Sequence, residues 1–248
     1  MLPVKGAMSL VTFDAFFDGR IQVRQESDGY RYSIDAVILA YFSKRLPGEK
    51  VLDLGTGCGI IPLIMAFRKP AIHVFGVEVQ SSLARLAVEN VKDNRMTDRI
   101  TILHADMKSL RIFMTGGPVD LVVVNPPFHR AGSGRINPND QRAVARHEIR
   151  VGLSDVMLTA RRMLRTGGYF LSIYTAERVC DLIIEMRKAG IEPKTLQAIQ
   201  SYENEAAKLV LVEGKKGGKP GTRLAPPIIL YHTDGAYTEA ARQMFQYD

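Results

Sequence analysis

The sequence has only two cysteines and no long apolar run. Cys58 and Cys180 lie far apart and form no metal-type pair, which argues against a disulfide scaffold or a zinc site and is typical of a reducing cytosol. The longest apolar runs, such as 121–124, are far shorter than the roughly 20 residues of a membrane-spanning helix. The first residues contain no sustained apolar segment, so no signal peptide is expected. We therefore expect a cytoplasmic protein with no membrane segment and no metal site.

The composition is that of a globular protein. Of 248 residues, 46% are hydrophobic and 24% are charged, close to the average for packed domains. Lysine and arginine number 33 against 26 acidic residues, giving a formal net charge of +7. This mild positive balance is compatible with a polyanionic partner, although it is also common in soluble proteins.

Apolar runs of strand length alternate with segments of helical periodicity. Strands are expected at 50–54, 73–77, 100–104, 121–124, 169–174, 196–201, 208–213 and 228–231. Helices are expected at 33–45, 60–68, 81–94, 154–164 and 176–189. This alternation predicts an α/β fold, a Rossmann-like doubly wound, mainly parallel sheet of seven to eight strands. The closely spaced final strands add an antiparallel edge.

No repeat or interdomain linker interrupts the chain. We expect a single domain over 1–248, with residues 1–49 as an extension packed on the core. Residues 128–150 form a long polar segment, and such loops in compact domains are usually functional. We expect this segment to be a substrate loop.

A glycine-rich turn follows the first expected strand of the sheet. It contains Gly55, Gly57 and Gly59, with Asp53 two residues upstream. A dinucleotide fingerprint would need glycine where Ile60 stands, and the Lys-Ser/Thr ending of a phosphate-binding Walker turn is missing. The GxGxG spacing after an aspartate is instead typical of S-adenosylmethionine-binding turns.

Polar residues also end the next three expected strands. These are Glu78, Asp106 and Asn125. In an open α/β sheet, ligands bind beyond the carboxyl ends of the strands, where such side chains can reach them. Each acid also has a simpler interpretation, because Glu78 can cap a helix and Asp106 can start a turn.

The sharpest motif is Asn125-Pro126-Pro127-Phe128. The two prolines fix the backbone and remove two N–H donors. The turn is left with two acceptors, the Asn125 side-chain oxygen and the Pro126 carbonyl, followed by an aromatic ring. Two acceptors and a stacking ring suit the methylation of an exocyclic amine on a flipped-out base.

With these motifs, the chain resembles the class I S-adenosylmethionine-dependent methyltransferases of the Asn-Pro-Pro-aromatic group. Within that group it is similar to the bacterial enzymes that methylate adenine N6 in the tRNA(Val) anticodon loop, immediately 3′ of the anticodon. The similarity extends over nearly the whole chain. It includes GYRYSIDA at 29–36, NPPF at 125–128, GSGRINP at 132–138 and ARHE at 145–148.

The resemblance implies a cofactor, S-adenosylmethionine, and a role for each matched residue. The cofactor-binding residues would be Asp35, Asp53, Gly55, Gly57, Glu78 and Asp106. The residues that hold the target base would be Asn125, Pro126 and Phe128. Glu78 would accept from the ribose hydroxyls and Asp106 from the cofactor adenine.

Two basic segments are candidate RNA contacts. The expected substrate loop contains five arginines and two carboxylates, and arginines there can clamp phosphates beside the base. We assign substrate binding to Arg130, Arg135 and Arg146. A second basic cluster, formed by Lys208, Lys215, Lys216, Lys219 and Arg223, is either an RNA contact or an ordinary flexible hairpin.

Several alternatives remain open from the sequence. Phe128 stands where many adenine-N6 enzymes have tyrosine, and Phe-His after Asn-Pro-Pro also resembles ribosomal guanine-N2 methyltransferases. Protein-glutamine methyltransferases share the cofactor turn, but they resemble longer chains with an N-terminal helical domain. A nicotinamide dehydrogenase and a catalytically silent scaffold explain the motifs less well. The sequence does not settle the oligomeric state.

Overall fold

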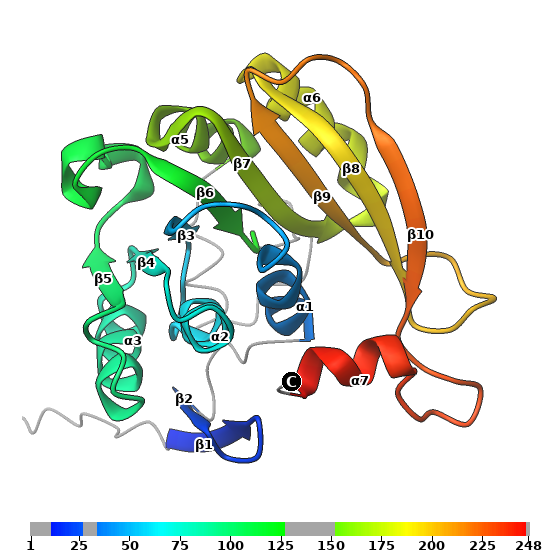
Figure 1. The fold of residues 1–248 in the computed structure, drawn as a ribbon, viewed down its shortest axis with the longest axis horizontal. Coiled ribbons are helices and arrows are strands. Elements are labelled where there is room, and N and C mark those ends of the chain that lie inside the picture. The colour runs from blue at the N-terminus through cyan, green and yellow to red at the C-terminus, as the bar shows by residue number, and fades with distance from the viewer. Residues whose placement is uncertain (1–10, 27–33, 127–151, 247–248) are drawn as a thin grey trace, which may run out of the picture.

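The centre of the protein is a sheet of eight strands with helices on both faces (Figure 1). The computed structural model describes residues 11–26, 34–126 and 152–246. The strand order is β10-β8-β9-β7-β6-β3-β4-β5. The strands are β3 (Lys50–Leu54), β4 (His73–Glu78), β5 (Ile100–His104), β6 (Val119–Val124), β7 (Leu164–Thr175), β8 (Ile191–Gln200), β9 (Leu209–Lys216) and β10 (Arg223–Ile229).

Most neighbours in the sheet are parallel, which confirms the predicted fold class. The antiparallel pairings belong to β9, which lies between β7 and β8 and runs against both. The outermost strand, β10, is parallel to β8. Its Pro226 and Pro227 interrupt the pairing between Ala225 and Ile228, and an edge strand tolerates prolines because one side has no ladder to complete.

Two apolar cores lie on the two faces of the sheet. Successive strand residues point to opposite faces, so Leu121 and Val123 of β6 join one core and Val122 and Val124 join the other. The first core includes α1 (Ile34–Ser43) and α2 (Ile60–Arg68), and the second includes α5 (Leu153–Met163) and α6 (Val179–Lys188). The strands that are covered on both faces are therefore almost entirely apolar.

The remaining described elements are two helices, three 3-10 turns and a two-stranded hairpin. They are helices α3 (Ser81–Asp93) and α7 (Glu239–Phe245), 3-10 turns η1 (Met107–Ser109), η2 (Ile112–Thr115) and η3 (Ala176–Arg178), and strands β1 (Val11–Phe16) and β2 (Ile21–Glu26). The sequence analysis missed the β1–β2 hairpin and α7. The hairpin had a readable signal, because Asp18-Gly19 lies between two alternating segments and both residues have positive φ.

The carboxyl ends of the central strands meet at one edge of the sheet. Leu54 at the end of β3 is opposite Val77 of β4 on one side and Val124 of β6 on the other. Because β4 and β5 lie on one side of β3 while β6 and β7 lie on the other, the strand order reverses at this point. Open α/β sheets bind ligands at such a reversal.

Candidate functional site

The glycine turn between β3 and α2 is shaped for close approach by a ligand. Gly55, Gly57 and Gly59 have φ of +75°, +57° and +86°, a region that glycine adopts without steric cost. A Cβ built on Gly55 or Gly57 would have no atom within 4 Å. The turn therefore leaves open space beside the two glycines that the sequence assigned to the cofactor.

The backbone of this turn is held by β4. The amides of Gly55 and Thr56 both donate to the Val77 carbonyl at 2.9 Å. The amide of Gly57 donates to Oε2 of Glu78, also at 2.9 Å. The turn is consequently fixed before any ligand binds, which lowers the ordering cost of binding.

Asp53 is a buried carboxylate beneath the turn, with 0% of its surface exposed. Its Oδ2 accepts a 2.6 Å hydrogen bond from the Thr56 hydroxyl, but Oδ1 has no hydrogen-bond partner among the described residues. Burial raises the pKa of Asp53 to about 7; the Thr56 bond opposes the shift and the negative charge of Glu78 adds to it. A buried carboxylate oxygen without a donor favours a cationic or hydrogen-bonding ligand.

Glu78 ends β4 and is 5% exposed. Its two oxygens accept from the backbone amides of Gly57 and Gln80, each at 2.9 Å. The residue thus shapes the glycine turn as well as the start of α3. Each carboxylate oxygen has a further lone pair, so these bonds are compatible with the ribose contact that the sequence predicts.

The other predicted acids occupy different surroundings. Asp106 is the N-cap of η1, where its Oδ1 accepts from the Lys108 amide at 2.8 Å and its Oδ2 lies 3.6 Å from the Lys108 ammonium. The simpler, turn-forming role considered for Asp106 is therefore present in the structure. Asp35 lies in the first turn of α1 and is buried.

Asn125 and Pro126 follow β6 directly. Asn125 is half-buried and Pro126 is buried. Since Val124 pairs with Leu54, the first half of the Asn-Pro-Pro motif begins one strand away from the glycine turn. Phe128, Arg130, Arg135, Arg146 and the expected substrate loop 128–150 lie outside the described residues.

These residues fit S-adenosylmethionine. The cofactor carries positive charge on its ammonium and sulfonium groups, which suits the unmatched Oδ1 of Asp53. The space beside Gly55 and Gly57 accommodates atoms that a Cβ would exclude. Asp53, Gly55 and Gly57 would hold the methionine part, with Glu78 on the ribose.

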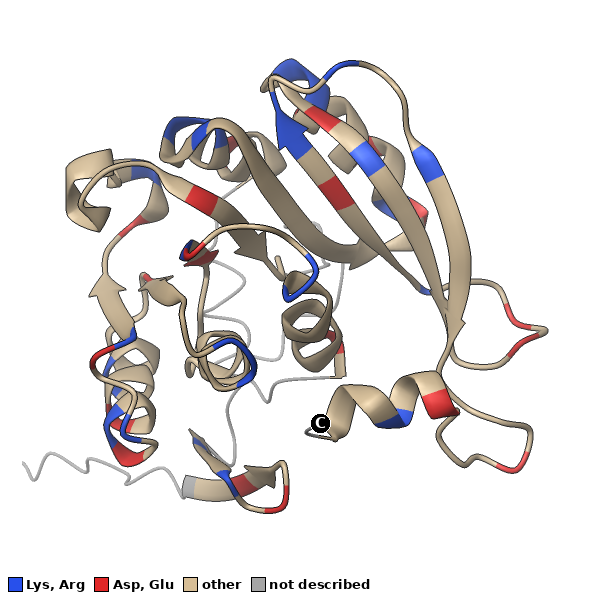
Figure 2. Ribbon diagram, viewed as in Figure 1, with Lys and Arg blue, Asp and Glu red and all other residues tan. Residues whose placement is uncertain are grey.

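The structure separates Lys208 from the other four members of the second basic cluster, which lie at the end of β9, in the β9–β10 turn and at the start of β10 (Figure 2). Lys208 precedes β9 and its backbone pairs with Ile199 and Ala176, whereas Lys216 ends β9 beside Ile191. Because β9 is a strand of eight residues, Lys208 and Lys216 lie at its opposite ends. The Lys216 ammonium donates to the carbonyls of Arg161 and Leu164 at 2.7 and 2.6 Å, and burial lowers its pKa. Lys216 is therefore a structural residue.

Sequence reasoning missed Thr56 and Gly76, which complete the turn. A Cβ on Gly76 would lie 2.9 Å from the Thr56 hydroxyl oxygen, so glycine at this strand position makes room for the side chain that bonds Asp53. A glycine inside an expected strand is a recognised signal of close approach. That signal was present at Gly76.

Two features are absent from the described part of the chain. Within it, no group of three His, Cys, Asp or Glu side chains could hold a metal ion. None of the helices in the described ranges is both long and apolar enough to cross a membrane.

Solved structures with a similar fold are methyltransferases. A protein described as a predicted O-methyltransferase from Agrobacterium tumefaciens has a TM-score of 0.68 and 22% identity, covering 86% of this chain and 98% of its own. A tRNA m1G37 methyltransferase from M. jannaschii has a TM-score of 0.60 and 14% identity, covering 88% of this chain and 60% of its own. At these identities the similarity shows the fold.

Curated relatives and a family profile are also methyltransferases. A protein from Porphyromonas gingivalis named tRNA1(Val) (adenine(37)-N6)-methyltransferase is 29% identical, covering 81% of this chain and 80% of its own. One with the same name from Pedobacter heparinus is 24% identical, covering 94% and 97%. The profile of the methyltransferase small domain matches residues 34–184. Because this match spans more than half of the sequence, the chain belongs to the methyltransferase small domain family.

Proposed function

We propose that this protein transfers a methyl group from S-adenosylmethionine to N6 of an adenine in tRNA, in the cytoplasm. We assign the target to the anticodon-loop adenine immediately 3′ of the anticodon in tRNA(Val). The observation that carries the proposal is the position of Asn125 and Pro126 at the end of β6. Val124 pairs with Leu54, which leads into the glycine turn.

The chemistry follows from the acceptors at this position. An exocyclic amine on a purine is a weak nucleophile because its lone pair is delocalised into the ring. The side-chain oxygen of Asn125 and the carbonyl of Pro126 can each accept one N–H, which holds the nitrogen with its lone pair available. When bound, S-adenosylmethionine supplies an electrophilic methyl group. Positioning and electrostatics are then sufficient for catalysis.

The choice of tRNA and of adenine is supported by the relatives. Those reported above are named for adenine N6 in tRNA1(Val) and align with most of this chain. The net charge of +7 is compatible with a polyanionic substrate. In this proposal, Phe128 stacks on the target base and the arginines of 128–150 bind the RNA phosphates.

The test uses S-adenosylmethionine with a labelled methyl group. The protein is incubated separately with unmodified tRNA, ribosomal RNA and release factor, and the labelled products are digested and identified by mass. We expect N6-methyladenosine in tRNA, and sequencing of the modified fragment should place it 3′ of the tRNA(Val) anticodon. N2-methylguanosine in ribosomal RNA or methylglutamine in protein would overturn the proposed substrate.

The variant Asn125→Ala tests the role of the acceptor. Because this side chain is assigned to the reacting base, we expect kcat to fall about 100-fold while the Kd of S-adenosylhomocysteine changes less than about threefold. Asn204→Ala, on an exposed loop residue, is the matched control and should change neither value. An equal loss in kcat and cofactor affinity would mean that Asn125 is structural.

A further inference from the structure

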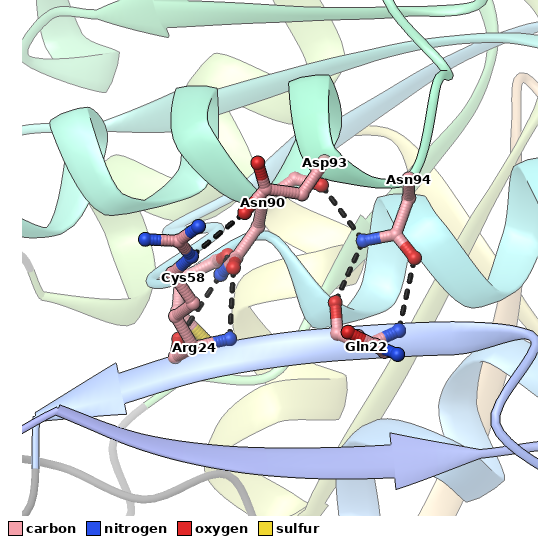
Figure 3. A network of polar contacts seen from close by, with 6 residues as sticks. All are labelled: Gln22, Arg24, Cys58, Asn90, Asp93 and Asn94. Atoms are coloured by element: carbon pink, nitrogen blue, oxygen red, sulfur yellow. Dashed lines mark hydrogen bonds and ion pairs between the residues drawn. The ribbon is translucent and has the colours of Figure 1, made fainter.

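Asn90 is a buried asparagine on α3 whose side chain reaches two other segments (Figure 3). None of its surface is exposed. Its Nδ2 donates to the carbonyl of Cys58 at 2.9 Å and to that of Arg24 at 3.0 Å, and its Oδ1 accepts from the Arg24 amide at 2.8 Å. Both N–H groups and the carbonyl of the amide are therefore engaged.

The first contact fixes one peptide plane of the glycine turn. The peptide between Cys58 and Gly59 is held on one side by Asn90, which binds the Cys58 carbonyl. On the other side the Gly59 amide donates to the Thr56 carbonyl at 2.9 Å. A Cβ on Gly59 would lie 3.3 Å from the Cβ of Ala87, so α3 packs directly against this part of the turn. Positive φ at Gly59 makes such a turn easy to distort if its peptide is released.

The second contact holds the β1–β2 hairpin. Asn90 pairs with both backbone groups of Arg24, as a neighbouring strand would. Asn94, one helical turn later, does the same for Gln22, at 2.9 Å for the amide and 2.6 Å for the carbonyl. The side-chain amides of Asn90 in α3 and of Asn94, the C-cap of this helix, thus pair with backbone groups along the outer edge of β2 (Figure 3). Only Asn90 also contacts the glycine turn.

We propose that Asn90 is a positioning residue of the cofactor site, through which docking of the β1–β2 hairpin holds the glycine turn in its binding conformation. The inference rests on the proposed use of S-adenosylmethionine at this turn. Coupling between two sites is reciprocal. Cofactor bound at the turn therefore stabilises the docked hairpin, although the hairpin residues Gln22 and Arg24 are not assigned to the cofactor.

The test compares Asn90→Ala with Asn94→Ala in a Cys180→Ser background. Both variants remove an amide that binds β2, but only Asn90→Ala releases the Cys58 carbonyl. Cys58 is buried and burial raises its pKa to about 11, so its alkylation rate reports opening of the turn. For Asn90→Ala we expect alkylation and the Kd of S-adenosylhomocysteine to rise about tenfold each. For Asn94→Ala both should stay within about twofold of the parent.

Two outcomes would overturn the inference. Unchanged alkylation and cofactor affinity in Asn90→Ala would remove the positioning role. Equal effects of the two variants would mean that any loosening of the hairpin is enough to open the glycine turn and weaken cofactor binding. The specific contact between Asn90 and Cys58 would then have no role of its own. Steady-state kinetics of Asn90→Ala add a further test. If Asn90 positions the cofactor turn, the KM for S-adenosylmethionine should rise about tenfold while kcat stays within about twofold of the parent value.

A measurement on the unmodified protein covers the case in which Asn90→Ala fails to fold. Amide hydrogen exchange is followed with and without S-adenosylhomocysteine. We expect slower exchange at the Arg24 amide with ligand present and no change at Leu230 beyond β10. Unchanged exchange at Arg24, despite ligand binding, would contradict the coupling. If the protein bound no S-adenosylhomocysteine, the proposed function would fail, whereas Cys58 alkylation would still test whether Asn90 holds the turn.

Discussion

Two glycine-rich turns of this protein look alike in sequence and differ in what surrounds them. One follows β3 and contains Gly55, Gly57 and Gly59; the other joins β9 to β10 and contains Gly217 and Gly221, with φ of +68° and +125°. Asp53, which accepts a hydrogen bond from Thr56 of the first turn, is buried, and its Oδ1 has no hydrogen-bond partner among the described residues. In the second, the Lys194 ammonium donates to the carbonyls of Lys219 and Gly221 at 3.1 and 2.7 Å.

The comparison shows that glycine content alone does not identify a ligand site. In the β9–β10 turn, the carbonyls of Lys219 and Gly221 accept hydrogen bonds from Lys194 of the adjacent strand β8, so these two acceptors are already paired. The β3–α2 turn has open space beside Gly55 and Gly57, and Oδ1 of the buried Asp53 has no hydrogen-bond partner among the described residues. A buried acceptor that has no donor within the described part of the chain is the stronger indication of a ligand, because leaving such an acceptor unpaired costs free energy.

The largest effect is expected for the matched pair Gly57→Ala and Gly217→Ala. The two glycines have similar φ, +57° and +68°, and neither has an atom closer than 4.0 Å to a built Cβ. Each substitution should therefore cost a similar free energy of unfolding, about 1–2 kcal/mol. Only Gly57→Ala fills the space assigned to the cofactor, so we expect the Kd of S-adenosylhomocysteine to rise about 100-fold, measured by calorimetry.

Gly217→Ala is the control for backbone strain in that pair. It should leave the Kd unchanged while lowering stability to urea by the same amount as Gly57→Ala. Parallel losses of affinity in the two variants would mean that the cofactor responds to overall stability. The distinction between the two turns would then be wrong.

Much of the first turn was predictable because its signals are local. The ranges of β3, α2 and β5 follow from apolar runs between turn residues, and the structure has them as expected. The polar residues at strand ends could be assigned to one edge because parallel strands end together. These inferences need only the order of residues along the chain.

The features that the sequence did not predict depend on contacts between segments far apart in the chain. The separation of Lys208 from Lys216 required knowing that β9 continues to Lys216, whereas the sequence predicted that this strand ends at 213. The pairing of Asn90 with Arg24 and Cys58 joins three separate segments, and nothing local distinguishes it from an exposed asparagine on a helix. The raised pKa of Asp53 depends on complete burial, which periodicity does not measure.

An intermediate effect is expected from pH and from Asp53→Asn. The pKa of Asp53 is about 7 in the folded protein against 3.8 for the ordinary carboxyl. Between these values the folded state holds a proton that the unfolded state lacks, so stability without ligand falls as pH rises from about 4 to about 7 and then levels. Urea unfolding should show this slope for the parent protein, and Asp53→Asn should remove Asp53's contribution to it.

Ionisation of Asp53 with rising pH, which lowers stability, should increase the affinity for the ligand. The α-ammonium group of S-adenosylhomocysteine prefers an ionised carboxylate beside it, so the affinity for this ligand should rise about tenfold between pH 6 and pH 8 as Asp53 loses its proton. Asp53→Asn should bind more weakly at pH 8 and flatten this part of the profile. A variant with the parent's pH profile would show that another group titrates and that Asp53 does not face the ligand.

The smallest effect is expected at the β9–β10 turn. Lys194→Ala removes two hydrogen bonds to the carbonyls of Lys219 and Gly221. Both bonds are exposed, so water replaces the lost donor and the free energy of unfolding should fall by at most about 1 kcal/mol in a urea titration. The affinity for S-adenosylhomocysteine should not change, because this turn lies at the edge of the sheet opposite the carboxyl ends of β3 and β4. A measurable loss of cofactor affinity in Lys194→Ala would mean that the two turns are energetically linked across the sheet. Hydrogen bonding of its carbonyls within the protein would then no longer distinguish the β9–β10 turn from a ligand-binding turn.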